Sequence, residues 1–485
     1  MAAKPDSTIR WILRPGTVLL ACGPLFAWSA NTLFADTRSA EPCEIRIVDD
    51  SNDWPVPLVE LRTTHNVRFV SDNAGVIAFD LPELMNRATW FHVEGHGYSV
   101  RKDGFGYVGV RVIPRPGKTL TIRVQRQLPA KRLGRITGGG LFAESQKLGR
   151  ESDWQEQGTL GCDSVQNAVH QGRLYWGWGD TVLPQYPLGR FHMIGATTPV
   201  QPLKSFEPPV RLRYDYFTDK EAVPDNVARM PGSGPTWLNG YASLPDRDGQ
   251  HHLVATYSKI EPPLTEYERG LCVWNEDRAV FEQHRVLWKK SEQHPVPPAA
   301  PHGHPVAWTD DAGTKWMLFG DPFPSLKCRA TFEDWSDPAS WQSLVPQEYV
   351  STRAATGGQK QAATQSDAES WPARVKPHRG AIAWNDFRQK WVSVFTQQFG
   401  KPSALGEIWY AESDSPTGPW QDAIRVVTHS QYSFYNPQLH PEFTPSGSSI
   451  LLFEGTYTRT FSATQTGTPR HDYNQVLYRL DLDEL

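Results

Sequence analysis

The chain has 485 residues, of which 39% are hydrophobic and 12% aromatic, including 19 tryptophans. This composition is typical of a folded protein and argues against a largely disordered chain. The net charge is −4 and no basic stripe is visible, which argues against nucleic acid as a partner because phosphates require a basic surface. The 40 prolines and 38 glycines favour a turn-rich, β-rich fold.

The first 35 residues have the pattern of an export signal. Positive charges precede a short apolar run at residues 17–27, and small residues follow it. The run is too short for a transmembrane span, and Pro24 interrupts it. We therefore expect a signal peptide at residues 1–35 and export to the periplasm or the cell exterior. Lipid anchoring at Cys22 is the alternative.

Four cysteines follow this signal: Cys43, Cys162, Cys272 and Cys328. They form no C-x-x-C pair, which excludes a zinc knuckle or a thioredoxin-like motif. Their wide spacing leaves two possibilities open, disulfides in an oxidising compartment or isolated buried thiols.

Residues 43–127 predict a small β-sandwich, because several short segments alternate polar and apolar side chains as half-buried strands do. The expected strands are residues 44–48, 57–62, 76–80, 91–98 and 119–124. Residues 57–61, the turn at 71–75 and the glycine-rich turn at 95–98 resemble the carboxypeptidase regulatory-like (transthyretin-like) domains of secreted proteins. The resemblance implies an accessory domain, so we assign no chemistry to it.

Beyond a predicted linker at residues 128–142, a polar cluster that leads into an apolar strand recurs five times. The five opening clusters are residues 161–169, 234–241, 301–308, 376–384 and 435–443. A second strand is expected after each of them, at residues 173–180, 252–257, 315–320, 390–395 and 449–454. Third strands are expected at residues 406–411 and 475–480. Such recurrence predicts a five-bladed β-propeller, in which the opening clusters meet at one mouth of the central channel.

Two further segments are interpreted within this scheme. Residues 351–370, rich in Ala, Thr and Gln, are expected to form a flexible excursion between blades. Residues 469–475 are either a binding loop or the segment that closes the ring by pairing the final strand with an early blade.

Residues 408–420, with the sequence IWYAESDSPTGPW, resemble the blade signature of five-bladed glycoside hydrolases of the arabinanase, xylosidase and invertase type. Residues 330–335 are interpreted as a degenerate copy of it. The resemblance implies a catalytic propeller at residues 143–485 and a carbohydrate substrate. The chain departs from the arabinanase pattern in one respect, because its later opening clusters carry mainly histidine, arginine and asparagine where that pattern has further acids.

Three carboxyl groups are candidates for glycosidic cleavage, which usually needs one protonated and one ionised carboxyl. Asp163 lies in the first opening cluster, where arabinanase-like families place their base; the alternative role is a turn cap. Asp180 ends a strand that carries Trp176 and Trp178 on one face, and the alternative is a core tryptophan pair with a turn aspartate. Glu454 ends an apolar strand, which favours a raised pKa; its alternative is an ion pair with an arginine such as Arg459 or Arg470.

The remaining polar and aromatic side chains of the clusters are expected to line the substrate site, with tryptophans stacking on sugar rings. The histidines are interpreted as general acids, metal ligands or the proton-transfer groups of a lyase, and His304 is a further catalytic candidate. An arginine beside a histidine favours an anionic sugar, its alternative being a salt bridge. The expected binding residues are Gln166, Asn167, Trp176, Trp178, Trp237, His302, His378, Arg379, Asn436 and His440.

Together these patterns predict an exported all-β protein, a small β-sandwich followed by a five-bladed β-propeller, that hydrolyses a polysaccharide or oligosaccharide. The alternatives are a polysaccharide lyase acting on a uronic acid and a non-catalytic propeller that binds glycan or protein. No cofactor is expected to be required, and a structural or channel-bound metal ion stays open.

Overall fold

The computed structural model describes residues 41–485 except 191, 354–370, 401–403, 430–431 and 463–465. The described residues are all-β, with two five-residue α-helices, α1 (Ala143–Lys147) and α2 (Phe332–Ser336), and a few 3-10 turns. The predicted export signal, including Cys22, and most of the predicted excursion at 351–370 lie outside the described residues. Among the helices that are described, none has the length and apolar character needed to cross a bilayer.

Residues 43–126 form two four-stranded sheets that share one hydrophobic cluster. The strands of the first sheet are, in spatial order, β4 (Val76–Phe79), β1 (Cys43–Asp49), β8 (Thr119–Arg126) and β6 (Tyr98–Ser99). Those of the second are β3 (Arg68–Val70), β2 (Glu60–Thr63), β5 (Thr89–Glu94) and β7 (Gly109–Val112). Alternation decides which side chains reach the cluster: Ile45 and Ile47 are buried in it beside Leu61 and Phe91, whereas Arg46 is exposed.

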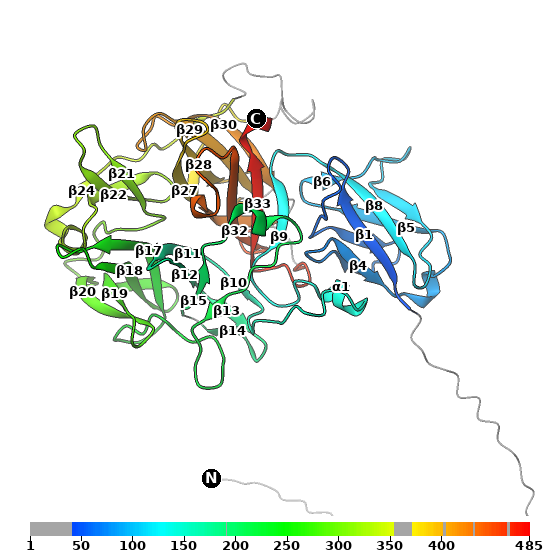
Figure 1. Ribbon diagram of the computed structural model, residues 1–485, viewed down its shortest axis with the longest axis horizontal. Helices are drawn as coiled ribbons and strands as arrows, with labels where there is room; N and C mark the ends of the chain where they lie inside the picture. Colours follow the sequence, from blue (N-terminus) through cyan, green and yellow to red (C-terminus); the bar gives the residue numbers. More distant parts are fainter. Residues whose placement is uncertain (1–40, 191, 354–370, 401–403, 430–431, 463–465) are drawn as a thin grey trace, which may run out of the picture. The chain divides into compact units, whose positions relative to one another are not determined.

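Five four-stranded antiparallel sheets follow along the rest of the chain (Figure 1). The first holds β11 (Gln166–His170), β12 (Arg173–Trp178), β15 (Ile194–Pro199) and β16 (Asp215–Tyr216). The second holds β17 (Thr236–Pro245), β18 (His251–Glu261), β19 (Thr265–Asn275) and β20 (Val280–Lys289). The third holds β21 (Val306–Thr309), β22 (Lys315–Gly320), β23 (Pro324–Arg329) and β24 (Gln342–Ser343). The fourth holds β27 (Pro377–Asn385), β28 (Lys390–Gln397), β29 (Glu407–Ser413) and β30 (Gln421–Thr428).

The fifth sheet combines β31 (Ser433–Leu439), β32 (Ile450–Thr458) and β33 (Asn474–Asp481) with β9 (Lys131–Arg135). Two small additions, β10 (Gly161–Cys162) with β13 (Thr181–Leu183) and β14 (Tyr186–Arg190), and β25 (Val350–Ser351) with β26 (Arg374–Val375), complete the strand inventory of the described residues. The first and second strands of every sheet overlap the strands expected from the sequence.

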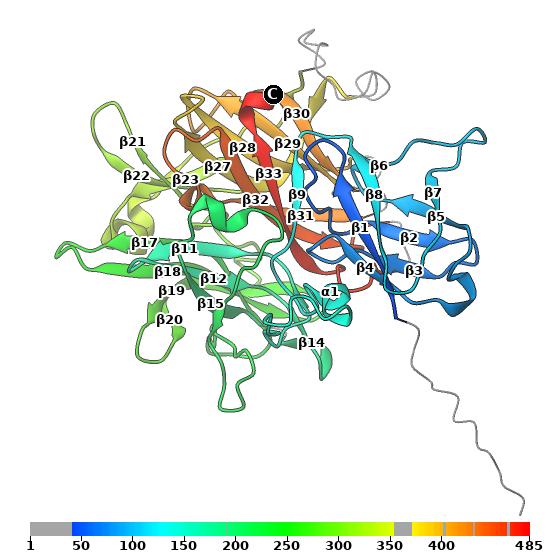
Figure 2. The same ribbon diagram turned by 45° about the vertical axis from the view of Figure 1, so that its right-hand side comes forward.

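The pairing of β33 with β9, which lie side by side in Figures 1 and 2, corrects the prediction of a linker at residues 128–142. The sequence of β9 lacks the alternation of polar and apolar residues that predicts a strand, because it contains Lys131, Arg132 and Arg135. All three side chains are nevertheless buried. The guanidinium of Arg132 is satisfied by four backbone carbonyls, those of Pro57, Leu58, Gly95 and His96. Partners of this kind make a buried charged strand tolerable, and they lie too far away in sequence to be predicted.

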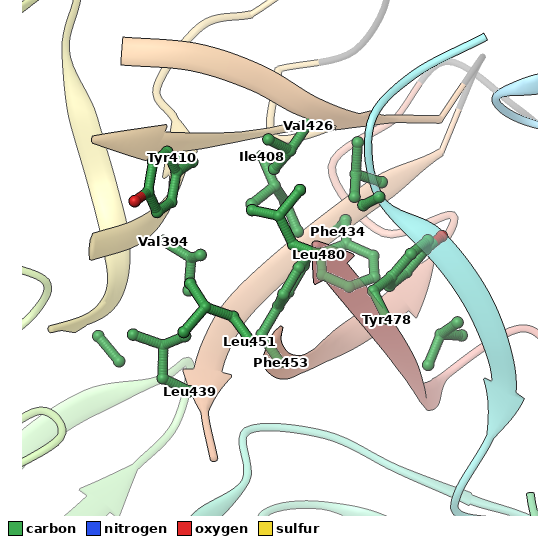
Figure 3. Packing of buried hydrophobic residues seen from close by; sticks show 14 of the residues in the cluster. Val394, Ile408, Tyr410, Val426, Phe434, Leu439, Leu451, Phe453, Tyr478 and Leu480 are labelled. Carbon is green, nitrogen blue, oxygen red and sulfur yellow. The ribbon is translucent and has the colours of Figure 1, made fainter. Parts of the chain in front are cut away.

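Apolar faces of neighbouring sheets form the hydrophobic clusters. Figure 3 shows the one between the fourth and fifth sheets, in which Val394 and Ile408 meet Phe434, Phe453 and other side chains of β31, β32 and β33. The four cysteines are also buried, and all four are free thiols. Burial raises the pKa of the Cys162 and Cys272 thiols, so both stay protonated and unreactive.

The antiparallel pairing of the first two strands brings two segments of each sheet to the same end. In the first sheet Gln166 at the start of β11 is opposite Gly177 near the end of β12. In the fifth sheet Ser433 at the start of β31 is opposite Thr458 at the end of β32. The opening before the first strand and the loop after the second strand are therefore neighbours in each sheet.

Candidate active site

A cavity of about 1250 Å³ is lined by residues of all five sheets. Opening segments and first strands contribute Asp163, Gln166, Trp237, His302, His378, Arg379, Tyr435 and Asn436. Loops after second strands contribute Asp180, Leu264, Asp321, Phe399 and Phe461. Side chains that are far apart in sequence are thus brought together around one space large enough for a ligand of several rings.

Asp163 lies in the turn before β11, and its carboxylate is held by two phenols. The hydroxyl groups of Tyr435 and Tyr473 donate to it, and the backbone N–H of Gly179 donates to the Asp163 carbonyl at 2.8 Å. Burial raises the pKa of Asp163, and the two tyrosine hydrogen bonds oppose that rise because they favour the ionised form. The result is a fixed carboxylate facing the cavity, as a base or nucleophile requires.

Asp180 follows β12 directly after Gly179 and lines the same cavity. The indole N–H of Trp237 donates to its Oδ1 at 3.3 Å. Burial, and after it the negative charge of Asp163, raises the pKa of Asp180 to about 7. At pH 7 Asp180 therefore holds its proton about half of the time, and it shares the cavity with Asp163, whose tyrosine hydrogen bonds favour the ionised form.

Substitution of Gly179 by alanine is expected to displace the Asp163 carboxylate, because a methyl group at this position would overlap Oδ1 of Asp163. A displacement of about 1 Å costs up to about 10²-fold in rate, so we expect kcat to fall by about that factor while the melting temperature changes little. Steady-state kinetics and thermal unfolding measure both effects. Gly104→Ala, where an added methyl group meets nothing, is the matched control. A parental kcat in Gly179→Ala would contradict the expected displacement.

Arg379 and His378 also reach the cavity, but the arginine is paired. Its guanidinium lies 3.3 Å from Oδ2 of Asp321, whose Oδ1 accepts the backbone N–H of Gly380 at 2.8 Å. Burial and the adjacent Arg379 lower the pKa of His378, so its imidazole is neutral. Its Nδ1 is buried and has no hydrogen-bond partner among the described residues.

Three further polar side chains line the cavity, and each already makes a hydrogen bond within the protein: Gln166, His302 and Asn436. Gln166 Oε1 accepts the Gly240 N–H at 2.9 Å, and His302 Nδ1 lies 3.0 Å from the Ala300 carbonyl. Asn436 donates to the hydroxyl of Ser164 at 2.5 Å.

Glu454, His440 and Asn167 do not line the cavity; they belong to one polar cluster, in which Glu454 and His440 are buried and Asn167 is partly buried. His440 Nε2 lies 2.8 Å from Glu454 Oε1, and its Nδ1 lies 2.9 Å from Glu442 Oε1. The Asn167 amide lies 3.2 Å from His440 Nδ1. The side chains of His440 and Glu454 are completely buried, so neither contacts substrate, which corrects two expectations. The ion-pair alternative for Glu454 is the one observed, with His440 as its partner in place of an arginine.

Two other expectations are corrected by burial. Trp176 and Trp178 do share one face, with parallel rings 5.8 Å apart, but that face packs against Tyr214 in a hydrophobic cluster and leaves no surface for a sugar. His304 is 8% exposed and does not line the cavity. Burial lowers the pKa of His304 to about 4, so it is neutral as well as inaccessible.

Several cavity residues were not predicted: Asp321, Leu264, Tyr435, Tyr473, Phe399 and Phe461. Four of them occupy, in their own sheets, the position that Asp180 occupies in the first, just after the second strand. This regularity was available in the sequence once the second strands had been assigned. Among the described residues, no group of three or more His, Cys, Asp or Glu side chains is arranged to hold a metal ion.

Comparison with known proteins gives remote structural likeness only. No protein family and no curated protein matches the sequence. Among solved structures, an exo-1,5-α-L-arabinanase from a bovine ruminal metagenomic library is 10% identical, with a TM-score of 0.35 over 67% of this chain and 95% of its own. An α-L-arabinanase mutant of Cellvibrio cellulosa is 12% identical, with a TM-score of 0.35 over 66% of this chain and 91% of its own. An exo-β-1,3-galactanase of Phanerochaete chrysosporium is 7% identical, with a TM-score of 0.33 over 66% of this chain and 60% of its own. Scores this low assign no activity.

Proposed function

We propose that the five sheets are the blades of a propeller and that the cavity is the active site of an exported glycoside hydrolase acting on a polysaccharide or oligosaccharide. The observation that carries the proposal is the pair of carboxyl groups in one cavity. Asp163 is oriented by two phenols, and Asp180 has a pKa raised to about 7. Glycosidic cleavage needs this division between an ionised and a protonated carboxyl.

In the proposed reaction Asp180 donates its proton to the glycosidic oxygen as the bond breaks. The Asp163 carboxylate either attacks the anomeric carbon or takes a proton from the water molecule that attacks this carbon. Tyr435 and Tyr473 hold Asp163 in place, and the Trp237 N–H orients Asp180. Glu454, which lies outside the cavity, has no part in the reaction.

Two observations disfavour a lyase and an anionic sugar. Burial and the neighbouring Asp163 raise the pKa values of Tyr435 and Tyr473 far above neutrality, so neither phenol supplies the phenolate base of a lyase. The three cavity arginines are already paired with carboxylates: Arg269 with Glu266 at 2.6 Å, and Arg379 with Asp321 and Arg459 with Asp472, each at 3.3 Å. None of these pairs leaves a dedicated cation for a uronic acid.

A glycan panel with product analysis tests the proposal. The full chain is incubated with arabinan, galactan, xylan, fructan and polygalacturonate, and products are followed by mass and by ultraviolet absorbance. A hydrolase releases fragments that have gained water and do not absorb. Absorbing, unsaturated fragments would identify a lyase, and binding without release would identify a glycan-binding propeller. No release from any of these polymers would overturn the proposal.

We expect kcat/KM to fall above about pH 7, by about tenfold for each further pH unit. The reason is that Asp180, whose pKa is raised to about 7, must hold its proton to act as general acid. A nitrophenyl glycoside of the same sugar, whose leaving group needs no proton, is the control and should lack this alkaline limb. An identical limb with both substrates would assign it to a different group.

A further inference from the structure

The loops that follow the second strands differ in chemistry from sheet to sheet. Those of the first and third sheets bring carboxyl groups to the cavity, Asp180 and Asp321. Those of the fourth and fifth sheets bring phenylalanines, Phe399 two residues beyond β28 and Phe461 three residues beyond β32. One side of the cavity mouth is therefore aromatic.

Neither phenylalanine is buried in the hydrophobic core. Phe399 is 79% exposed and Phe461 is 61% exposed, whereas Phe395 and Phe434 in the same two sheets are fully buried. Both loop residues also adopt left-handed backbone conformations, with φ of 57° and 64°. Such a conformation is unfavourable for bulky side chains, whereas glycine adopts it readily. Apolar area that stays exposed adds no stability. Two residues that cost stability at the rim of one cavity indicate a role in binding.

Contacts place Phe461 close to the proposed reaction. Its ring meets that of Tyr435 edge to face, with centroids 5.8 Å apart and planes at 81°. Tyr435 in turn donates its hydroxyl hydrogen to Asp163. One aromatic ring thus separates Phe461 from the carboxylate that would act on the scissile bond.

We propose that Phe399 and Phe461 form an aromatic subsite that binds the C–H face of a sugar ring adjacent to the scissile bond. This inference rests on the proposed function and adds to it a substrate of at least two sugar units. A sugar ring presents a patch of C–H groups that stacks on an aromatic face, and we take for each such contact the value found for a pair of aromatic rings, about 0.5–1.5 kcal/mol. The two phenylalanines would therefore select a chain over a single glycoside.

The test compares substrates of increasing length in Phe399→Ala, Phe461→Ala and the double variant. The probes are linear oligosaccharides of two to five units made from arabinan, galactan and xylan, together with the nitrophenyl glycoside of each single sugar. Each substitution is expected to raise KM for the oligosaccharides by about 2- to 13-fold, and to raise KM less for the nitrophenyl glycosides, which lack the second sugar ring. Phe387→Ala is the matched control, since Phe387 is 44% exposed in the same fourth sheet but lies in the turn between β27 and β28, at the opposite end. Phe399→Leu, which keeps apolar bulk without a ring, should behave as Phe399→Ala.

Calorimetric titration with the same oligosaccharides separates this inference from the hydrolase proposal. If the parent binds them without cleaving any, the hydrolase proposal fails, and weaker binding by the alanine variants still supports the subsite. If the variants bind and turn over every chain length as the parent does, the subsite is overturned and the hydrolase stands. Absence of binding by the parent to all of these oligosaccharides overturns the subsite, and the glycan panel, which also contains fructan and polygalacturonate, then decides the hydrolase proposal.

Discussion

Replacement of Asp163 by asparagine is expected to lower kcat by about 10²–10⁴-fold without lowering the melting temperature. The amide has the shape of the carboxylate and still accepts a hydrogen bond from Tyr435, but it can neither take a proton nor attack carbon. Steady-state kinetics on the polymer cleaved in the glycan panel and thermal unfolding measure the two effects.

Asp472→Asn provides the comparison, because Asp472 also lines the cavity but is engaged with Arg459. This variant should keep a kcat close to that of the parent. If Asp163→Asn kept the parental kcat, or if both variants lost activity equally, Asp163 could not be the group on which the reaction depends.

Replacement of His440 by alanine is expected to lower the free energy of unfolding by about 3–5 kcal/mol. The substitution leaves Glu454, which is fully buried, and Glu442 without the group that lies between them. Denaturant unfolding at neutral pH measures the loss. The matched control is His251→Ala, whose imidazole is exposed and makes a single hydrogen bond to Ser243. Stability equal to that of the parent would contradict a charged cluster at this position.

The same cluster predicts a loss of stability in alkali. Burial lowers the pKa of His440, but Glu442 and Glu454 raise it by more, to about 9. Because the pKa is higher in the folded state than in the unfolded chain, the stabilisation is complete below about pH 6.5 and disappears as pH rises through about 9. The difference in unfolding free energy between parent and His440→Ala should therefore shrink over this interval.

Strands were the part of the fold that the sequence predicted best, because alternation and turn residues are local properties. Residues 315–320 were expected as a strand, and β22 (Lys315–Gly320) has those bounds. Local patterns failed where charge replaced them: β9 was missed because its charged side chains find distant partners.

The site was predicted in part, for a related reason. Alternation shows that two side chains share a face, as Trp176 and Trp178 do, but not whether that face meets the cavity or the core. An apolar strand suggested a raised pKa for Glu454 and burial does raise it, but the same burial removes Glu454 from the substrate. Asp163 and Asp180 were predicted from their positions at strand ends, and both line the cavity.

The pairing of β33 with β9 has a consequence for how the protein is made. On the ribosome the first four sheets can form in succession as the nascent chain emerges, but the fifth lacks β33, its central partner, until residues 474–481 are synthesised. Until then β9 and β32 present unpaired backbone edges that can join other chains. Completion of the fifth sheet therefore waits until β33 has been synthesised, and the growing polypeptide needs protection from aggregation during that interval.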